Sequence, residues 1–288
     1  MSIVERALGK IREERAAEHK AAAAVAPPSR MEVAVAPTVP PAIVPAHSLT
    51  LDPIALRSTG LLPAEQFDRR VRDDYRRIKW PLLEVAQGRG TTRIERANLL
   101  MVTSAEPGEG KSFTTMNLAL AFAAESDCSV LLVDGDLARP KISAALGLEN
   151  ERGLTDFLKD PKLSLSDVVF ATDRRGLSLL PAGRPDSHAP ELLAGQRMET
   201  IMAEFASRPQ SLVLFDTPPL LATNEAQVIS RLVGQVVVVV KADETSRTAV
   251  KNAIELISKT AAVGVVLNQS KSLFGAPHYG DYYGYNRA

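Results

Sequence analysis

The sequence has almost no cysteine and no excess of charge of either sign. It contains one cysteine, Cys128, which excludes an intrachain disulfide framework. The four histidines are scattered, so a structural zinc site is also disfavoured. Lys plus Arg number 34 and Asp plus Glu number 34, giving a formal net charge of +0. General binding to nucleic acid, which needs a basic surface, is therefore not expected.

Long hydrophobic runs are also missing. The most apolar run, residues 236–240, is far shorter than the roughly 20 residues needed to span a bilayer. Residues 1–20 carry charges throughout and lack the apolar core of a secretory signal. The sequence thus predicts a soluble, cytoplasmic protein that reaches the inner face of the cell membrane only through a partner.

Aromatic residues are scarce and unevenly placed. They make up 5% of the chain, and there are five tyrosines, of which one is Tyr75. The other four lie in the final stretch PHYGDYYGYNRA, as Tyr279, Tyr282, Tyr283 and Tyr285. Glycine and aspartate separate these phenols, so the rings cannot be buried together and the segment is predicted to be flexible.

The pattern along the chain divides it into four parts. Residues 1–20 have a helical apolar spacing and are expected to form a docking helix. Residues 21–60 are rich in Ala and Pro and are interpreted as an extended linker, because proline removes donors and fixes φ. Residues 61–270 are expected to form the globular domain, and 271–288 the flexible tyrosine tail.

Short apolar runs alternate with helical stretches after residue 98. The expected strands are 99–103, 130–133, 177–180, 212–215, 236–240 and 264–267, and the expected helices are 111–124, 223–232 and 246–260. Continuous apolar strands separated by helices predict an α/β fold, with a parallel sheet covered by helices on both faces. Ligands of such sheets bind at the carboxyl ends of the strands.

The stretch LLMVTSAEPGEGKSFTTMNLALAF predicts a strand, a glycine turn and a helix, which is the context of a P-loop. Backbone N–H groups of such a turn face phosphate oxygens. Lys111 is expected to reach the β- and γ-phosphates and Ser112 to hold Mg²⁺. The standard pattern departs at Ala105, where a glycine is usual. The predicted nucleotide-binding residues here are Gly108, Glu109, Gly110, Lys111, Ser112 and Phe113.

Carboxylates follow two other predicted strands. Asp134 and Asp136 come directly after the strand in LLVDGDLARP, and Asp216 follows the strand in LVLFDTPP. Mg²⁺ prefers oxygen ligands, so these groups predict a magnesium site beside the P-loop. Arg139 is expected either to touch phosphate or to pair with one of the aspartates. The core is therefore predicted to bind Mg·ATP or Mg·GTP.

These three motifs together resemble those of the bacterial tyrosine kinases that act in exopolysaccharide and capsule production. The resemblance covers residues from about 64 to 288 and includes GLTDFL at 153–158. The terminal helix and Ala/Pro linker are similar to stand-alone autokinases of exosortase-associated gene clusters. The resemblance implies ATP and Mg²⁺ as cofactors, assembly with copies of itself, and a membrane chain-length regulator as activator, for which residues 1–20 are the candidate docking element.

The resemblance also implies roles for single residues. Lys111 binds the phosphates, while Ser112, Asp136 and Asp216 complete the metal environment. Asp134 is the candidate base for the tyrosine proton, although the choice between Asp134 and Asp136 stays open because both lie on one turn. A Glu-x-x-Arg-x-x-Arg motif used by the family in ring assembly corresponds here to Asp73, Arg76 and Lys79. Lysine lacks the planar fork of arginine, which bears on ring affinity.

The tyrosine tail then has a predicted purpose. It is expected to enter the active site of a neighbouring subunit and to be phosphorylated there. Each phosphate adds about −1.5 to −2 charges, so a fully modified tail repels its neighbours and favours dissociation of the ring.

Two other functions stay open at this stage. The first is a partition or division-site ATPase of the same P-loop branch, which carries a lysine where this chain has Glu106. The second is a nucleotide-dependent scaffold without catalysis. Asn268 and Gln269, after the last strand, are either base contacts or ordinary turn residues.

Overall fold

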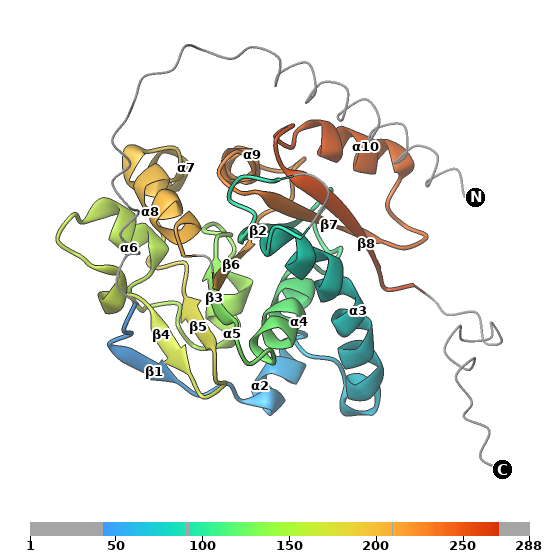
Figure 1. Cartoon of the computed structure of the whole chain (residues 1–288), viewed down its shortest axis with the longest axis horizontal. Coiled ribbons are helices and arrows are strands. Elements are labelled where there is room, and N and C mark those ends of the chain that lie inside the picture. Colours follow the sequence, from blue (N-terminus) through green and yellow to red (C-terminus); the bar gives the residue numbers. More distant parts are fainter. Residues whose placement is uncertain (1–42, 90–92, 209, 271–288) are drawn as a thin grey trace. The chain divides into compact units, whose positions relative to one another are not determined.

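The computed structural model describes residues 43–89, 93–208 and 210–270 (Figure 1). Within these residues an eight-stranded sheet has the order β1-β4-β5-β3-β6-β2-β7-β8. Neighbouring strands run parallel except β4 and β5, which are antiparallel. The strands are β1 (His47–Leu49), β2 (Leu99–Ser104), β3 (Ser129–Asp134), β4 (Phe170–Thr172), β5 (Leu177–Leu180), β6 (Ser211–Asp216), β7 (Gln235–Lys241) and β8 (Ala262–Asn268).

Helices cover both faces of this sheet, as the sequence pattern predicts (Figure 1). One face carries α2 (Pro53–Ser58), α3 (Asp68–Ala86), α4 (Lys111–Ala123) and α5 (Lys141–Ala145). The other carries α6 (Leu154–Lys159), α7 (Ala189–Leu193), α8 (Gln196–Ala206), α9 (Asn224–Ser230) and α10 (Arg247–Glu255). Two short 3₁₀ turns are η1 (Glu65–Phe67) and η2 (Leu165–Asp167).

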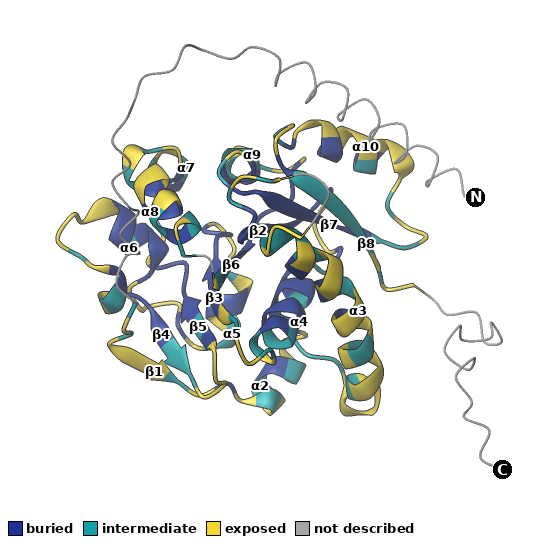
Figure 2. Ribbon diagram, viewed as in Figure 1, coloured by how far each residue is buried: buried dark blue, intermediate teal, exposed yellow. Residues whose placement is uncertain are grey.

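The central strands are buried on both faces (Figure 2), and the residues in the middle of each are apolar for that reason. In β2, Leu99 and Met101 pack into the core on the α8 side, while Leu100 and Val102 pack on the α4 side. All six residues of β2 are buried. The predicted strands and the helices after β2, β6 and β7 are thus confirmed, and β2 holds the central place from which the glycine loop leaves.

The predicted linker extends too far. Residues 47–58, assigned from sequence to the linker over 21–60, form β1 and α2. β1 pairs with β4, and Asp52 caps α2 by accepting a hydrogen bond from the Ile54 N–H at 2.8 Å. Leu56 is then fully buried against the α3–α4 layer. Proline at the first helical turn, read as a linker signal, starts this helix.

The helix expected over residues 2–18 and the tyrosine tail lie outside the described residues. Within the part of the chain that the structure describes, no helix is both long enough and apolar enough to cross a membrane.

Two glycines provide a matched test of the packing. A Cβ on Gly234, just before β7, would lie 2.3 Å from the Glu95 carbonyl oxygen, whereas a Cβ on Gly264 in β8 would meet nothing within 4 Å. We expect Gly234→Ala to lower the free energy of unfolding by about 1–3 kcal/mol through overpacking. Gly264→Ala should leave it unchanged or raise it by up to about 1 kcal/mol. Urea denaturation of both variants measures the difference, and equal midpoints would refute this packing.

Candidate nucleotide-binding site

The glycine loop between β2 and α4 has the backbone that a phosphate cradle needs. Gly108 and Gly110 have φ values of 85° and 94°, which favour glycine. Gly110 is the N-cap of α4, so the helix begins at Lys111. A Cβ at position 110 would lie 2.0 Å from the Asn268 Nδ2 atom. Glycine is therefore required at position 110 both by conformation and by the close approach of β8.

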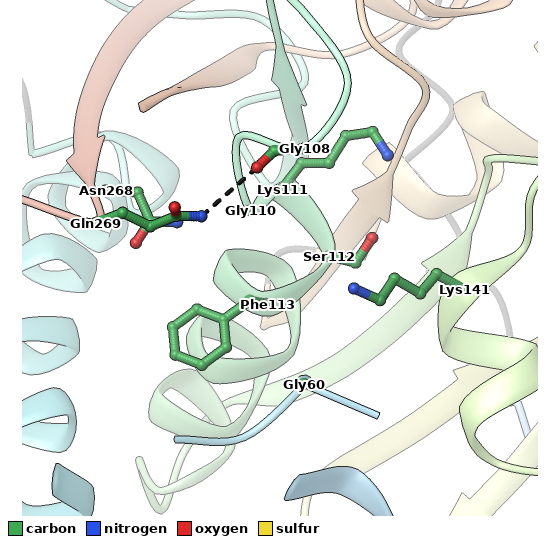
Figure 3. Close-up of a pocket in the computed structure, with 9 residues that line it drawn as sticks. All are labelled: Gly60, Gly108, Gly110, Lys111, Ser112, Phe113, Lys141, Asn268 and Gln269. Atoms are coloured by element: carbon green, nitrogen blue, oxygen red, sulfur yellow. Dashed lines mark hydrogen bonds between the residues drawn. The ribbon is translucent and has the colours of Figure 1, made fainter. Parts of the chain in front are cut away.

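A cavity of about 370 Å³ opens beside this loop (Figure 3). It is lined by Gly60, Gly108, Gly110, Lys111, Ser112, Phe113, Lys141, Asn268 and Gln269. Five of the predicted loop residues thus share one cavity, and the helix N-terminus at its wall is suited to anions. Glu109 and Arg139, also predicted to bind the nucleotide, are not among the lining residues.

The turn after β3 delivers a carboxylate to the loop lysine. Lys111 Nζ lies 3.1 Å from Asp136 Oδ2 and donates a hydrogen bond to it. The other oxygen, Oδ1, accepts from the Arg139 backbone N–H at 3.1 Å. Arg139 thus holds Asp136 through its main chain, while its side chain is exposed. The structure brings Lys111 and Asp136 together as one unit.

Asp134 and Asp216 lie opposite each other at the ends of β3 and β6. Asp134 Oδ2 accepts from the backbone N–H and the hydroxyl of Ser143 at 2.8 and 2.7 Å. Asp216 Oδ1 accepts from the Thr115 hydroxyl at 3.0 Å. Both side chains are completely buried, yet Asp134 Oδ1 and Asp216 Oδ2 have no hydrogen-bond partner among the residues described. Each carboxylate is thus fixed through one oxygen, and its other oxygen is unpaired at the carboxyl edge of the sheet.

Burial shifts the titration of this pair. The pKa of Asp134 is raised to about 7: loss of hydration is the largest cause, the nearby Asp216 carboxylate adds to it, and the hydrogen bonds from Ser143 oppose it. The pKa of Asp216 is raised to about 6: loss of hydration is the largest cause, and the Lys111 charge and the hydroxyls of Ser112 and Thr115 oppose it. A nearby cation would favour the charged form of both.

The donor set fits Mg²⁺ bound together with a nucleotide. No group of three or more His, Cys, Asp or Glu side chains converges at metal-binding spacing in the described residues. Mg²⁺ seldom uses such a cage, since it keeps several waters and takes one or two carboxylates plus phosphate oxygens. The free oxygen of Asp216, the Asp136 carboxylate and the buried Ser112 hydroxyl supply ligands of this type.

The predicted assembly motif does not lie on one surface. Asp73 and Arg76 form an exposed ion pair of 3.2 Å on α3. Lys79 is buried: its Nζ donates to the Ala121 carbonyl at 2.9 Å and pairs with Glu125. Within this chain Lys79 thus faces α4, while Asp73 and Arg76 face outward, and the role of the three residues in assembly stays a prediction. The four tail tyrosines lie outside the described residues.

Two roles were missed at the level of sequence. Lys141, the first residue of α5, lines the cavity near Ser112 (Figure 3). The sequence feature that could have indicated Lys141 is its position shortly after the turn that carries Asp136. Glu109 was assigned to the ligand, but its side chain is turned toward β7 and is buried. No sequence pattern indicates that contact, because its partner lies 136 positions further along the chain.

The fold and the loop define a P-loop NTPase. A family model described as "ParA: NUBPL iron-transfer P-loop NTPase" matches residues 95–282, more than half of the chain. This match agrees with the parallel sheet and with the loop at the carboxyl end of its central strand.

Comparison with known proteins identifies a family within the P-loop NTPases. Tyrosine-protein kinase YwqD of Bacillus subtilis is 37% identical over 187 residues, which cover 64% of this chain and 77% of the relative. Putative tyrosine-protein kinase CapB of Staphylococcus aureus is 31% identical, covering 59% of this chain and 74% of its own length. The crystal structure of the VpsO kinase domain superimposes with a TM-score of 0.60 at 27% identity, covering 72% of this chain and 100% of that one. The chain belongs to the bacterial tyrosine kinase family and is a protein-tyrosine kinase.

The shifted carboxylates predict a pH-dependent stability in the absence of metal and nucleotide. A carboxyl whose pKa is raised on folding binds more protons in the folded state, so stability falls as pH rises from the unfolded value near 4 toward about 7. We expect the melting temperature to decrease between pH 5 and pH 8 in chelator. Asp134→Asn should flatten this slope, and the exposed Asp127→Asn should not. Equal slopes for wild type and Asp134→Asn in thermal scans would contradict the assignment.

Proposed function

We propose that this kinase binds Mg·ATP in the cavity beside the glycine loop and phosphorylates tyrosines of the C-terminal tail of a neighbouring copy. The observation that carries the proposal is the unit formed by Lys111 and Asp136, 3.1 Å apart, next to two buried carboxylates with free oxygens. A cation, a metal-ligand set and a helix N-terminus then meet at one edge of the sheet. Phosphoryl transfer depends mainly on such positioning and charge neutralisation.

Each residue has a defined role in this proposal. Backbone N–H groups of 108–112 and the start of α4 hold the phosphates, and Lys111 neutralises the transferred group. Lys141, on the other wall of the cavity, adds a second positive charge. Ser112, Asp136 and Asp216 hold Mg²⁺, which when bound screens the negative charge between the phosphates and the attacking oxygen. Asn268 and Gln269 lie on the wall where the rest of the nucleotide would extend.

The reaction moves one phosphoryl group and one proton. The tyrosine oxygen forms a bond to the γ-phosphorus as the bond from that phosphorus to the β,γ-bridging oxygen breaks, which leaves ADP. The phenolic proton passes to a carboxylate of the turn after β3. Asp134 suits this step because its pKa of about 7 matches neutral pH and its Oδ1 is free. Asp136 is already engaged by Lys111, which suits a positioning and metal-binding role.

The acceptors are Tyr279, Tyr282, Tyr283 and Tyr285. Their segment follows β8, whose end at Asn268 lines the cavity. Four phosphates would add roughly −6 to −8 charges to one end of each subunit and drive a ring of copies apart. By the resemblance noted above, this cycle regulates exopolysaccharide polymerisation and export. Residues 1–20 then bind a membrane chain-length regulator that activates the kinase and recruits it to the cell membrane.

A partition-type ATPase is the second candidate, favoured by the ParA-type family match. The position that carries the signature lysine in such ATPases holds Glu106, which is exposed and contacts the loop through its backbone N–H. A glutamate there adds negative charge where a partner's phosphate would be. ATP hydrolysis without phosphotyrosine would support this candidate.

The direct test of the kinase proposal is autophosphorylation of the full chain with ATP and Mg²⁺, followed by mass spectrometry of the modified sites. We expect phosphotyrosine in residues 279–285. Lys111→Met should abolish it, and Lys162→Met, a change at an exposed lysine, should not. Asp134→Asn should slow labelling about 10²–10⁴-fold if it removes the base. Labelling of wild type that spares all four tail tyrosines would contradict the proposed substrate.

Assembly provides an independent prediction. Arg76→Ala removes an exposed charge, so it should weaken self-association and leave the free energy of unfolding unchanged. Lys79→Ala removes a buried contact to α4, so it should lower that free energy by about 1–2 kcal/mol. Analytical ultracentrifugation and urea denaturation separate the two effects. Loss of stability in Arg76→Ala, or full stability in Lys79→Ala, would reverse the assignment of these two side chains.

A further inference from the structure

The Glu109 side chain points away from the nucleotide cavity that its neighbours line. Gly108 and Gly110 line the cavity, while the Glu109 side chain is 2% exposed and lies on the opposite side of the loop. Its Oε2 accepts from the Glu106 backbone N–H at 2.7 Å. Its Oε1 accepts from the Thr245 hydroxyl and from the Lys241 N–H at 3.4 Å. The carboxylate therefore joins the loop to a different part of the chain.

That other part is the connection between β7 and α10. The Thr245 hydroxyl donates to Glu109 and accepts from the Lys241 N–H at 3.2 Å, so it is held from both sides. β7 is the neighbour of β2 in the sheet, which places this connection beside the glycine loop. Thr245 does not line the cavity. Its direct link to the glycine loop is the hydrogen bond to Glu109.

The loop needs such an anchor because glycine leaves its backbone free. Glu109 stands between two glycines with positive φ, and such residues lose more conformational freedom on ordering than any others. The Asn268 Nδ2 atom donates to the Glu109 carbonyl at 2.9 Å and fixes the same residue from the side of β8. A buried carboxylate is tolerated when it is hydrogen-bonded, which these donors satisfy. The peptide groups that face the phosphates are then ordered before the nucleotide arrives.

We propose that Glu109 is a positioning residue that holds the phosphate-binding loop in its binding conformation through the Thr245 hydroxyl. This inference rests on the proposed nucleotide site and deepens it. A preordered loop loses less entropy on binding, so the anchor increases affinity for ATP in the ground state and the transition state alike. Its loss should raise KM and leave kcat nearly unchanged.

Two matched pairs of variants test the anchor. Thr245→Val removes the hydroxyl and keeps the shape, and Thr245→Ser keeps the hydroxyl. Glu109→Ala removes the anchor, and Glu109→Gln weakens it, because the amide oxygen still accepts from the Glu106 N–H but the amide N–H₂ then faces two donors, the Thr245 hydroxyl and the Lys241 N–H. Each variant is made in the full chain, and its melting temperature is recorded without nucleotide.

The measurements are the Kd of Mg·ATP by calorimetry and the KM and kcat of tail phosphorylation. We expect Thr245→Val and Glu109→Ala to raise Kd and KM about tenfold, as for loss of a charge-assisted hydrogen bond, with kcat within about twofold of wild type. Thr245→Ser should stay within about threefold, and Glu109→Gln should lie between wild type and Glu109→Ala. The double variant Glu109→Ala, Thr245→Val should be no weaker than Glu109→Ala alone, because both changes break one contact.

Several results would overturn the inference. Three results would show that the contact does not support nucleotide binding. These are a wild-type Kd in Thr245→Val, equal losses of affinity in the valine and serine variants, and additive losses of affinity in the double variant. A lower melting temperature of Thr245→Val with unchanged Kd would show a purely structural contact. These results leave the proposed function standing. The proposed function would instead be contradicted if the wild type did not bind Mg·ATP, or if Lys111→Met bound Mg·ATP as tightly as the wild type.

Discussion

The site depends on the parallel register of β2, β3 and β6, whose carboxyl ends meet at one edge of the sheet. This register places Asp134 opposite Asp216 in adjacent strands and sets the glycine loop beside them. Burying two carboxylates completely costs desolvation free energy, and without a compensating positive charge they destabilise the fold. Their raised pKa values and unpartnered oxygens support the proposal that positive charge binds there.

Lys111 brings positive charge from the chain itself to these carboxylates. Its ion pair with Asp136 holds the ammonium at the rim of the cavity and ties the loop to the turn after β3. That turn is stabilised in its own right, since the Arg139 N–H and the Ser143 hydroxyl each hold one of its carboxylates. Loop and turn therefore behave as one charged cluster, and a nucleotide with its metal would exchange contacts within it.

The same loop is held on its other side by β7 and β8. Glu109, Thr245 and Asn268 form that second attachment, which involves no residue of the carboxylate cluster. Two sets of contacts from opposite sides thus fix a backbone that glycine would leave loose. Helix α3 likewise has two different faces: Lys79 lies on the face that packs against α4, and Arg76 lies on the face exposed to solvent.

Local pattern was sufficient to predict the α/β class, the central strands and the P-loop, because apolar runs, glycines and a lysine at a helix start act over a few residues. The position of Lys111 and the aspartates at one edge of the sheet also followed, since parallel strands end at the same edge. The sequence-based prediction assigned residues 47–58 to the linker. A three-residue strand and a short helix that begins with proline have the composition of a linker, and only their packing against the sheet and α3 distinguishes them. The prediction gave no indication that Lys79 and the Glu109 side chain are buried. Whether a charge is exposed or buried depends on which helix or strand packs against it, and only the tertiary structure decides that over separations of 46 and 136 residues.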